Sequence, residues 1–178
     1  MIIRKARVDD ARGIAKVHLD TWKSAYRGIV PDDYLASLSS QKLERGWTKA
    51  LQQVSPPEVV FVVDDPEEGI IGFARAGPCK SDPYHYAAEL QAIYILEKHQ
   101  RKGLGKQLFF QVTRHFFQHK INSMVLWVLT ENSATLFYEE LGGTAIAQNQ
   151  REIGGENLPI TAYAWPRLAD VIPRPDNS

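Results

Sequence analysis

The sequence predicts an α/β fold, a single domain with a mixed central sheet of about six to seven strands flanked by helices. Three observations lead to this class. Strand-like runs rich in β-branched residues alternate with segments of helical periodicity. A long helical segment lies between two apolar strands, which requires a parallel, right-handed crossover. The last two strand-like runs are joined by Gly154 and Gly155, as in a hairpin.

The N-terminal half reads as a strand, three helices and a hairpin. Residues 2–8 form a short strand, and Asp9 or Asp10 caps a helix that Gly28 ends. A short second helix follows Pro31. The third helix and the two arms of the hairpin are expected at Gln41–Gln53, Glu58–Asp65 and Ile70–Gly77.

The C-terminal half contains the crossover and the terminal hairpin. The run AAELQAIYILE is a strand whose apolar character predicts burial on both faces. The helix after it carries its large apolar side chains on one face. These are Leu104, Leu108, Phe109, Val112 and Phe116. The strand NSMVLWVLT, the short helix ENSATLFYEELGG and two hairpin strands complete a domain over residues 1–165. Residues 166–178, with three prolines, are expected to be a loose tail.

Composition excludes several classes of protein. Lys plus Arg and Asp plus Glu both count 21, so the basic excess typical of nucleic-acid binders is missing. Cys79 is the only cysteine, which excludes an internal disulfide and suits a reducing cytoplasm. No signal peptide and no membrane-spanning run is expected. His115 and His119 have the spacing of two metal ligands, but no third ligand joins them, so we expect no metal site.

The stretch HQRKGLGKQLF, residues 99–109, combines two glycines with basic side chains where a strand passes into a helix. One interpretation is a glycine turn before a solvated helix end. The other is an anion site, because the first backbone N–H groups of a helix have no partner within it and the dipole favours negative charge. Positive charge at a helix N-terminus is unfavourable without an anion, which favours the second interpretation.

Two common phosphate motifs do not fit this stretch. A Walker loop ending at Gly105 and Lys106 would need glycine where Gln100 stands and Ser or Thr where Gln107 stands. A dinucleotide fingerprint starting at Gly103 would need glycine where Leu108 stands. A nucleotide enzyme of either kind is therefore a distant alternative.

The pattern that fits is Q-x-x-G-x-G, from Gln100 to Gly105, directly after a strand. Together with AELQAIYI upstream and ENSATLFYEELGG downstream, the chain resembles the GNAT superfamily of acyl-CoA-dependent N-acyltransferases. The order of elements over residues 2–165 is similar to the family fold. Two positions depart from the family pattern. Asn132 stands one residue closer to Ala134, and Gly143 stands where an aromatic residue is usual.

The resemblance implies acetyl-CoA as cosubstrate. Gln100 would hold the glycine loop, and the backbone of the loop would hold the pyrophosphate. The pantetheine arm would lie between two splayed parallel strands and pair with backbone groups of Ile93, Tyr94 and Ile95. Asn132 would contact this arm. The residues of the loop are Arg101, Lys102, Gly103, Leu104, Gly105 and Lys106.

The resemblance also implies direct attack of an amine on the thioester. An alkylammonium with a pKa of ~10 must first lose a proton. Glu89, at the start of the central strand, is the predicted general base, directly or through water. Tyr138 is the predicted donor to the departing thiolate. The structural alternatives stay open: Glu89 as a surface carboxylate, and Tyr138 as a packing residue beside Phe137.

The acceptor is expected to be a primary amine of a small molecule, an amino acid or a peptide. In the family the first helices wall the acceptor pocket, whereas the same aromatic residues would by default belong to the core. The residues expected to line the pocket are Trp22, Tyr26, Tyr34, Tyr84, His85 and Tyr86. A second function stays open, a module that binds acyl-CoA without turnover. Pairing of two copies through the terminal strands is common in the family.

Overall fold

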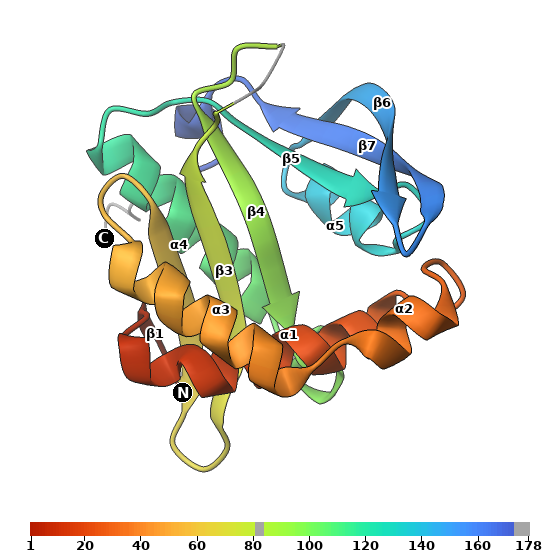
Figure 1. Ribbon diagram of the computed structural model, residues 1–178. Helices are drawn as coiled ribbons and strands as arrows, with labels where there is room; N and C mark the ends of the chain where they lie inside the picture. The colour runs from red at the N-terminus through yellow and green to blue at the C-terminus, as the bar shows by residue number, and fades with distance from the viewer. Residues whose placement is uncertain (81–83, 173–178) are drawn as a thin grey trace.

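A computed structural model describes residues 1–80 and 84–172 of the chain. Its centre is a seven-stranded mixed sheet in the order β1-β2-β3-β4-β5-β7-β6 (Figure 1). The strands are β1 (Ile2–Lys5), β2 (Val59–Asp65), β3 (Gly69–Pro78), β4 (Ala88–Ile95), β5 (Met124–Leu129), β6 (Thr144–Ile153) and β7 (Glu156–Trp165). The α-helices are α1 (Ala11–Ala25), α2 (Asp32–Ser37), α3 (Ser40–Gln53), α4 (Leu104–Gln118) and α5 (Ala134–Glu140). The predicted fold class is confirmed.

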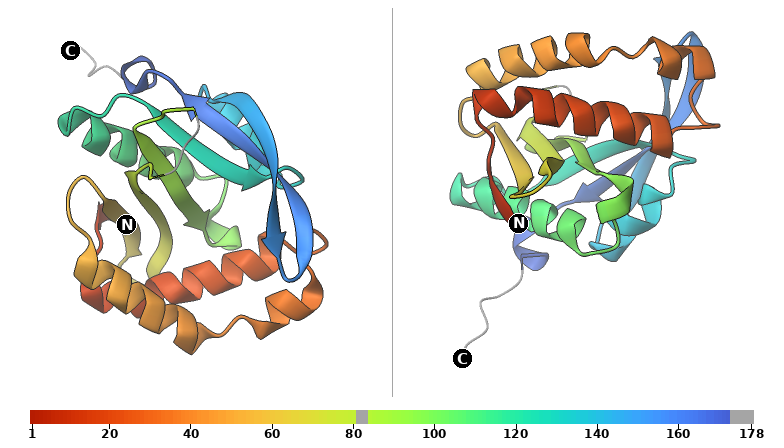
Figure 2. Two further views of the ribbon diagram at one scale, coloured as in Figure 1. Left: turned by 45° about the horizontal axis from the view of Figure 1, so that its top comes forward. Right: turned by 90° about the horizontal axis from the view of Figure 1, so that it is seen from below.

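Helices cover both faces of the sheet. Helices α1 and α3 lie together on one face and α4 on the other, which Figure 2 shows from below. On the α4 side the five predicted apolar side chains of this helix are buried against the sheet. Helix α5 packs on the same side, where the Tyr138 ring lies 6.0 Å from that of Tyr163 in β7. The buried face of α4 that the helical periodicity of the sequence predicted is therefore confirmed.

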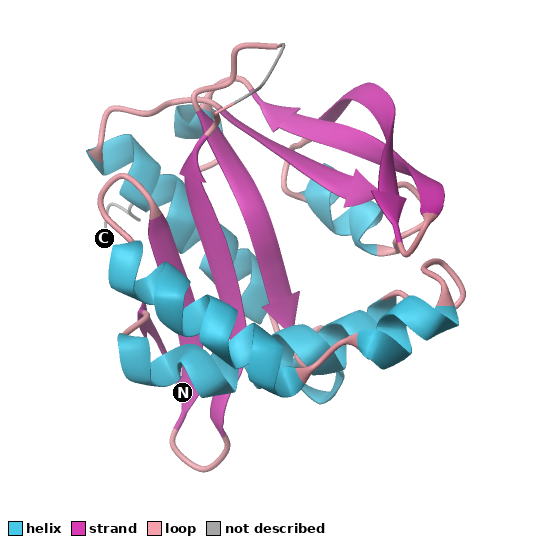
Figure 3. Cartoon of the chain, viewed as in Figure 1, coloured by secondary structure: helices cyan, strands magenta, loops and turns pink. Residues whose placement is uncertain are grey.

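The parallel strands β4 and β5 pair only at their first residues. Ala88 pairs with Met124 and Glu89 with Val125, and no pairing between the two strands continues beyond them. Strand β5 remains paired with β7 along its whole length, and β4 remains paired with β3. The two strands diverge toward their C-terminal ends, as Figure 3 shows. The backbone of β4 from Gln91 to Ile95 therefore has no β5 partner along this edge.

Three expectations of the sequence analysis need correction. The first strand ends at Lys5, because a 3₁₀ turn, Val8–Asp10, follows it. Asp10 does precede α1, but its carboxylate accepts hydrogen bonds from Arg4 and from the backbone N–H of Arg7 instead of capping the helix.

The segment after β7 is not a loose tail as far as it is described. A 3₁₀ turn, Leu168–Asp170, places the Leu168 side chain in the main core, fully buried. Asn122 anchors this turn, because its carbonyl accepts from the N–H of Leu168 and its side chain from the N–H of Ala169. The buried Leu168 side chain and the two hydrogen bonds to Asn122 together dock the segment. Residues 173–178 lie outside the described part.

Within residues 1–80 and 84–172, no helix is both long and apolar enough to cross a lipid bilayer. The same residues hold no group of three or more His, Cys, Asp or Glu side chains arranged to bind a metal ion. The His115 and His119 pair is instead used locally: a ring nitrogen of each contacts a backbone carbonyl, that of Pro57 and that of His115 respectively.

Candidate active site

The glycine loop between β4 and α4 has the backbone geometry of an anion site. Arg101 and Gly103 adopt left-handed conformations with φ of 59° and 79°, and turns of this kind form the concave N–H arrays that bind anions. Gln100 donates from Nε2 to the carbonyl of Ile95 at 2.9 Å, which ties the loop to the end of β4. Gly103 occupies the N-cap position of α4, and a Cβ there would meet nothing closer than 3.9 Å.

The first turn of α4 carries no acidic residue and its cap makes no side-chain hydrogen bond. Its leading N–H groups are thus free of a side-chain cap, unlike those of α3, where the Ser39 hydroxyl accepts from Lys42 N. Lys106 extends away from the loop, with Nζ 5.7 Å from the ring centre of Phe110. Gly105 has a packing role, because a Cβ there would lie 3.2 Å from the Phe137 ring of α5.

A β-bulge in β4 decides where Glu89 points. The β3 residues Arg75 and Ala76 are neighbours, yet they pair with Ala92 and Leu90, so Gln91 is an extra residue in β4. Glu89 pairs with Gly77 of β3, which lies on the same face of that strand as Arg75. The Glu89 side chain therefore shares the α1 and α3 face of the sheet.

Three aromatic residues meet on this face at the other end of β4. The Trp22 indole donates from Nε1 to the Tyr94 hydroxyl at 3.2 Å, and the hydroxyls of Tyr26 and Tyr94 are 3.4 Å apart. Burial raises the pKa of both phenols, and for Tyr26 the neighbouring Tyr94 raises it further. Both hydroxyls consequently stay protonated around neutral pH.

Tyr138 and Asn132 approach the same hydroxyls from the α5 side. Burial raises the pKa of Tyr138, and the Tyr94 phenol adds to that rise, so the two groups interact across the gap between β4 and β5. The Asn132 side chain lowers the pKa of Tyr26 by hydrogen bonding. Asn132 also lies outside α5 and caps its start, because Oδ1 accepts from the N–H of Ala134 at 2.9 Å. The short spacing between Asn132 and Ala134 thus allows the Asn132 side chain to cap α5.

His18 belongs to this site although the sequence analysis did not select it. Its ring stacks on that of Tyr94 with centroids 5.7 Å apart. Trp47 donates from Nε1 to His18 Nδ1 at 3.2 Å, so the neutral ring carries its proton on Nε2. Burial lowers the pKa of His18 to about 4. A signal was present in the sequence, since His18 lies one helical turn before Trp22.

The predicted acceptor residues fall into two hydrophobic clusters, one that contains Trp22, Tyr26 and Tyr34 and one that contains Tyr86. Trp22 lies 4.7 Å from Tyr26 and 6.1 Å from Tyr34 between ring centres, and these three pack against β5 and β7. Tyr86 packs further along β5, and Trp127, which the sequence analysis missed, touches both groups.

His85 does not join these groups. His85 is exposed, has a φ of 62°, and makes no hydrogen bond, ion pair or ring contact with the described residues. Tyr84 is also exposed, at 47%. The expectation that His85 lines an aromatic pocket therefore has no support in the described geometry.

The hairpin of β6 and β7 closes one side of the aromatic group. Its turn lies beside the segment between α1 and α2 (Figure 1). A Cβ on Gly154 would lie 2.8 Å from the Tyr34 side chain and 3.3 Å from Pro31. The second departure from the family pattern is also explained by close packing, since a Cβ on Gly143 would lie 2.7 Å from the Trp165 ring.

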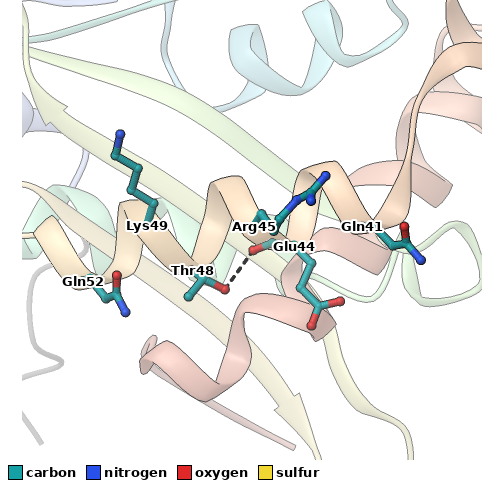
Figure 4. Close-up of a pocket in the computed structure, with 6 residues that line it drawn as sticks. All are labelled: Gln41, Glu44, Arg45, Thr48, Lys49 and Gln52. Atoms are coloured by element: carbon teal, nitrogen blue, oxygen red, sulfur yellow. Dashed lines mark hydrogen bonds between the residues drawn. The ribbon is translucent and has the colours of Figure 1, made fainter.

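A hollow on the outside of α3 is unrelated to this site. Figure 4 shows its six lining side chains, all from that one helix. They are Gln41, Glu44, Arg45, Thr48, Lys49 and Gln52. The Thr48 hydroxyl donates to the Glu44 carbonyl at 2.9 Å, so part of this polarity is used within the helix. All six lining residues come from one helix, so the hollow lacks the polar groups converging from several elements that are typical of a binding site.

The arrangement suits a long ligand with a phosphate at one end. The loop offers N–H groups for the phosphate, and the unpaired edge of β4 offers backbone partners for an extended arm. Three tyrosine hydroxyls and Asn132 gather where such an arm would pass between β4 and β5. The Glu89 carboxylate lies on the same face of β4, near the end where β4 and β5 still pair, so the site contains groups able to accept and to donate protons.

Comparisons with known proteins agree with this geometry. The family model described as FR47-like protein matches residues 83–152. The chain is 36% identical over 168 residues to the uncharacterized N-acetyltransferase YuaI of Bacillus subtilis, and the match covers 94% of both proteins. It is 24% identical to the spermidine N(1)-acetyltransferase of Thermoplasma acidophilum, over 79% of this chain and 86% of that protein.

Solved structures share the fold. The PaiA N-acetyltransferase of Thermoplasma acidophilum in complex with coenzyme A superposes with a TM-score of 0.67 at 21% identity, covering 90% of this chain and 96% of that one. A GNAT superfamily phosphinothricin acetyltransferase from Sinorhizobium meliloti in complex with acetyl-CoA gives a TM-score of 0.69 at 17% identity, covering 99% and 94%.

Proposed function

Because the chain belongs to the GNAT superfamily of N-acetyltransferases and uses acetyl-CoA as cosubstrate, we propose that it acetylates a primary amine by direct transfer in a ternary complex. Glu89 is the general base and Tyr138 the proton donor in this proposal. The observation that carries it is the meeting of Tyr138, Tyr94 and Tyr26 across the gap between β4 and β5, on the face of β4 that also carries Glu89.

The proposed proton path starts at the acceptor. Glu89 takes a proton from the ammonium group and passes it to solvent, which frees the nitrogen lone pair to form the N–C bond. The second proton, which nitrogen loses as the amide forms, then goes to the same carboxylate. Glu89 and Tyr94 lie four β3 positions apart, which is ~13 Å along the strand. We place water between the carboxylate and the amine for this reason.

At the other end of the path the C–S bond breaks and the sulfur leaves with its electron pair. The Tyr138 hydroxyl donates to this sulfur and is reprotonated from solvent. Free backbone N–H groups of β4 stabilise negative charge that develops on the carbonyl oxygen. Asn132 and the glycine loop position acetyl-CoA, with backbone contacts from Ile93 to Ile95 along its arm.

The proposal does not yet specify which amine accepts the acetyl group. A relative is named a spermidine acetyltransferase and a structural neighbour a phosphinothricin acetyltransferase, so a polycation and an amino acid with an added acidic group are two contrasting candidates. The aromatic group of Trp22, Tyr26 and Tyr34 is proposed to line the acceptor site.

The direct test is a panel of amines incubated with acetyl-CoA and assayed for free thiol and for the acetylated product. Transfer to at least one amine above the rate of thioester hydrolysis supports the proposal. Acetyl-CoA binding measured by calorimetry together with no transfer to any amine would instead favour a protein that binds acyl-CoA without turnover.

A further inference from the structure

Arg151 is a cation on the inner face of the β6–β7 hairpin. In antiparallel strands, paired residues carry their side chains on the same face. Arg151 pairs with Leu158, and the next pair on that face is Asn149 with Ile160. Leu158, Ile160 and the nearby Ile153 all pack into the cluster that contains Trp22, Tyr26 and Tyr34. The strand register therefore directs Arg151 toward the proposed acceptor side.

The position of Arg151 has an electrostatic consequence at the centre of the site. Its positive charge lowers the pKa of the buried Tyr94 phenol and so partly opposes the effect of burial. Tyr94 is the residue whose hydroxyl accepts from Trp22 and contacts Tyr26. The Arg151 charge therefore acts at this hydroxyl, in agreement with the strand register that directs Arg151 to this face.

Arg151 has no protein partner among the described residues. It is exposed and forms neither an ion pair nor a hydrogen bond within residues 1–80 and 84–172. The carboxylate of Glu58, on the same face of the sheet as Glu89, is by contrast neutralised by Arg75 at 2.7 Å. Arg151 is thus a cation on this face with no ion pair to a described carboxylate, and its positive charge disfavours a polycationic acceptor beside it.

We propose that Arg151 binds an anionic group of the acceptor, so that the preferred substrate is an amine that also carries a carboxylate or a similar acid. This inference rests on the proposed function and narrows its substrate class. A guanidinium can hold a carboxylate through two parallel hydrogen bonds, which fixes orientation as well as adding affinity. The ion pair is made equally in the bound ground state and in the transition state, so it lowers KM and leaves kcat unchanged.

The test compares amines in matched pairs, each amino acid beside its own carboxamide. The panel contains L-methionine, L-phenylalanine, glycine and 6-aminohexanoate, with spermidine as the polycation. The wild-type protein should prefer each acid over its amide. In Arg151→Gln the KM for the acids should rise about 10- to 100-fold with kcat little changed, which is the size expected for loss of a charge-assisted hydrogen-bonded pair. The KM for the amides should stay within about twofold, because the amide has no charge to lose.

Arg114→Gln makes the same chemical change on α4, on the other side of the sheet, and should change neither KM. A second readout is independent of turnover: in the presence of CoA, the preferred acid should raise the melting temperature of wild type but not of Arg151→Gln.

Wild-type activity that is equal on acids and amides, or highest on spermidine, would overturn the role of Arg151 while leaving the proposed function intact. An acid-to-amide ratio unchanged by Arg151→Gln would do the same. Failure of transfer to every amine, with no effect of any acid on the melting temperature, would overturn both.

Discussion

Glu89 and Tyr94 carry their side chains on the same face of β4, although their positions differ by five residues. In a regular strand an odd separation puts two side chains on opposite faces. The extra residue Gln91 changes this, because the β3 partners of Glu89 and Tyr94, Gly77 and Phe73, are four positions apart. Without the bulge, Glu89 would point toward α4, away from the acceptor side. The predicted base and the tyrosine hydroxyls share one face only because of this bulge.

The first prediction concerns Glu89. Glu89→Gln keeps the shape of the side chain and removes the base, so turnover near neutral pH should fall by ~10²-fold or more. The loss should shrink as pH approaches the amine pKa of ~10, where the acceptor is already neutral. The pH–rate profile of the variant checks this. Glu58→Gln is the matched control, since it removes a carboxylate from the same face, and an equal loss there would indicate a general electrostatic effect instead of base catalysis.

The second prediction concerns the glycine loop. Gly103 has a φ of 79°, a conformation that Asn and Asp tolerate better than other residues with a side chain. Gly103→Asn and Gly103→Asp therefore impose similar strain and differ by one negative charge. Acetyl-CoA affinity in the Asp variant should be about 100-fold below that of the Asn variant, because like charges placed together cost several kcal/mol.

Calorimetry measures the two affinities, and melting temperatures without ligand show whether the two variants are equally stable. Equal affinity of Asp and Asn variants would mean that no phosphate sits against Gly103. Gly105 is a poorer position for this experiment, because a side chain there would also collide with Phe137.

The third prediction concerns His18 and pH. Its folded-state pKa of about 4 lies below the ordinary value of 6.5. Between these two pH values the unfolded chain binds more protons than the folded chain. The free energy of unfolding therefore rises as pH increases from about 4 to 6.5, and it falls as pH decreases through the same window. The loss should be on the order of 3 kcal/mol. The physical reason is that a protonated ring would be charged, buried, and unable to accept from Trp47.

His18→Asn should remove this pH dependence, because the amide oxygen can accept from Trp47 and does not titrate. Urea unfolding between pH 4 and 7 gives the free energy of unfolding for both proteins. The carboxylates titrate in wild type and in the variant alike, so their contributions cancel in the difference between the two free energies of unfolding. Parallel curves across the window would show that His18 does not titrate in the way that its burial implies.

Element order, helix faces and the glycine loop were accessible from sequence because they depend on local periodicity and turn chemistry. The bulge at Gln91 was not, since a strand with one extra residue looks regular until its partner is known. Trp127 looked like any apolar strand residue. His18 lies on the same helical face as Trp22, but its contact with Trp47 of another helix could not be read from that face. The docking of Leu168 depends on Asn122, 46 positions earlier. Each of these features depends on a tertiary contact between segments that are distant in sequence. A local sequence pattern carries no information about such contacts.

The last prediction concerns Tyr138. Its ring packs on the α5 side of the sheet, while its hydroxyl is influenced by Tyr94 from the opposite face. Because its pKa is raised, the phenol remains a donor throughout the neutral and mildly alkaline range. The departing sulfur is most charged late in the reaction, so a hydrogen bond to it contributes more to the transition state than to the ground state. Tyr138→Phe should therefore lower kcat by ~10- to 10³-fold with little change in the acetyl-CoA KM.

Tyr163→Phe is the control, because it removes a hydroxyl bonded to Glu139 from a ring 6.0 Å from that of Tyr138. If both variants lose stability equally and only Tyr138→Phe loses kcat, the hydroxyl acts on the reaction and not on packing. A fall in kcat that follows the fall in melting temperature in both variants would assign Tyr138 a structural role. An unchanged kcat in Tyr138→Phe would remove it from the proton path, and donation to the sulfur would then have to come from another group at the gap, of which Tyr94 and Tyr26 are the nearest candidates.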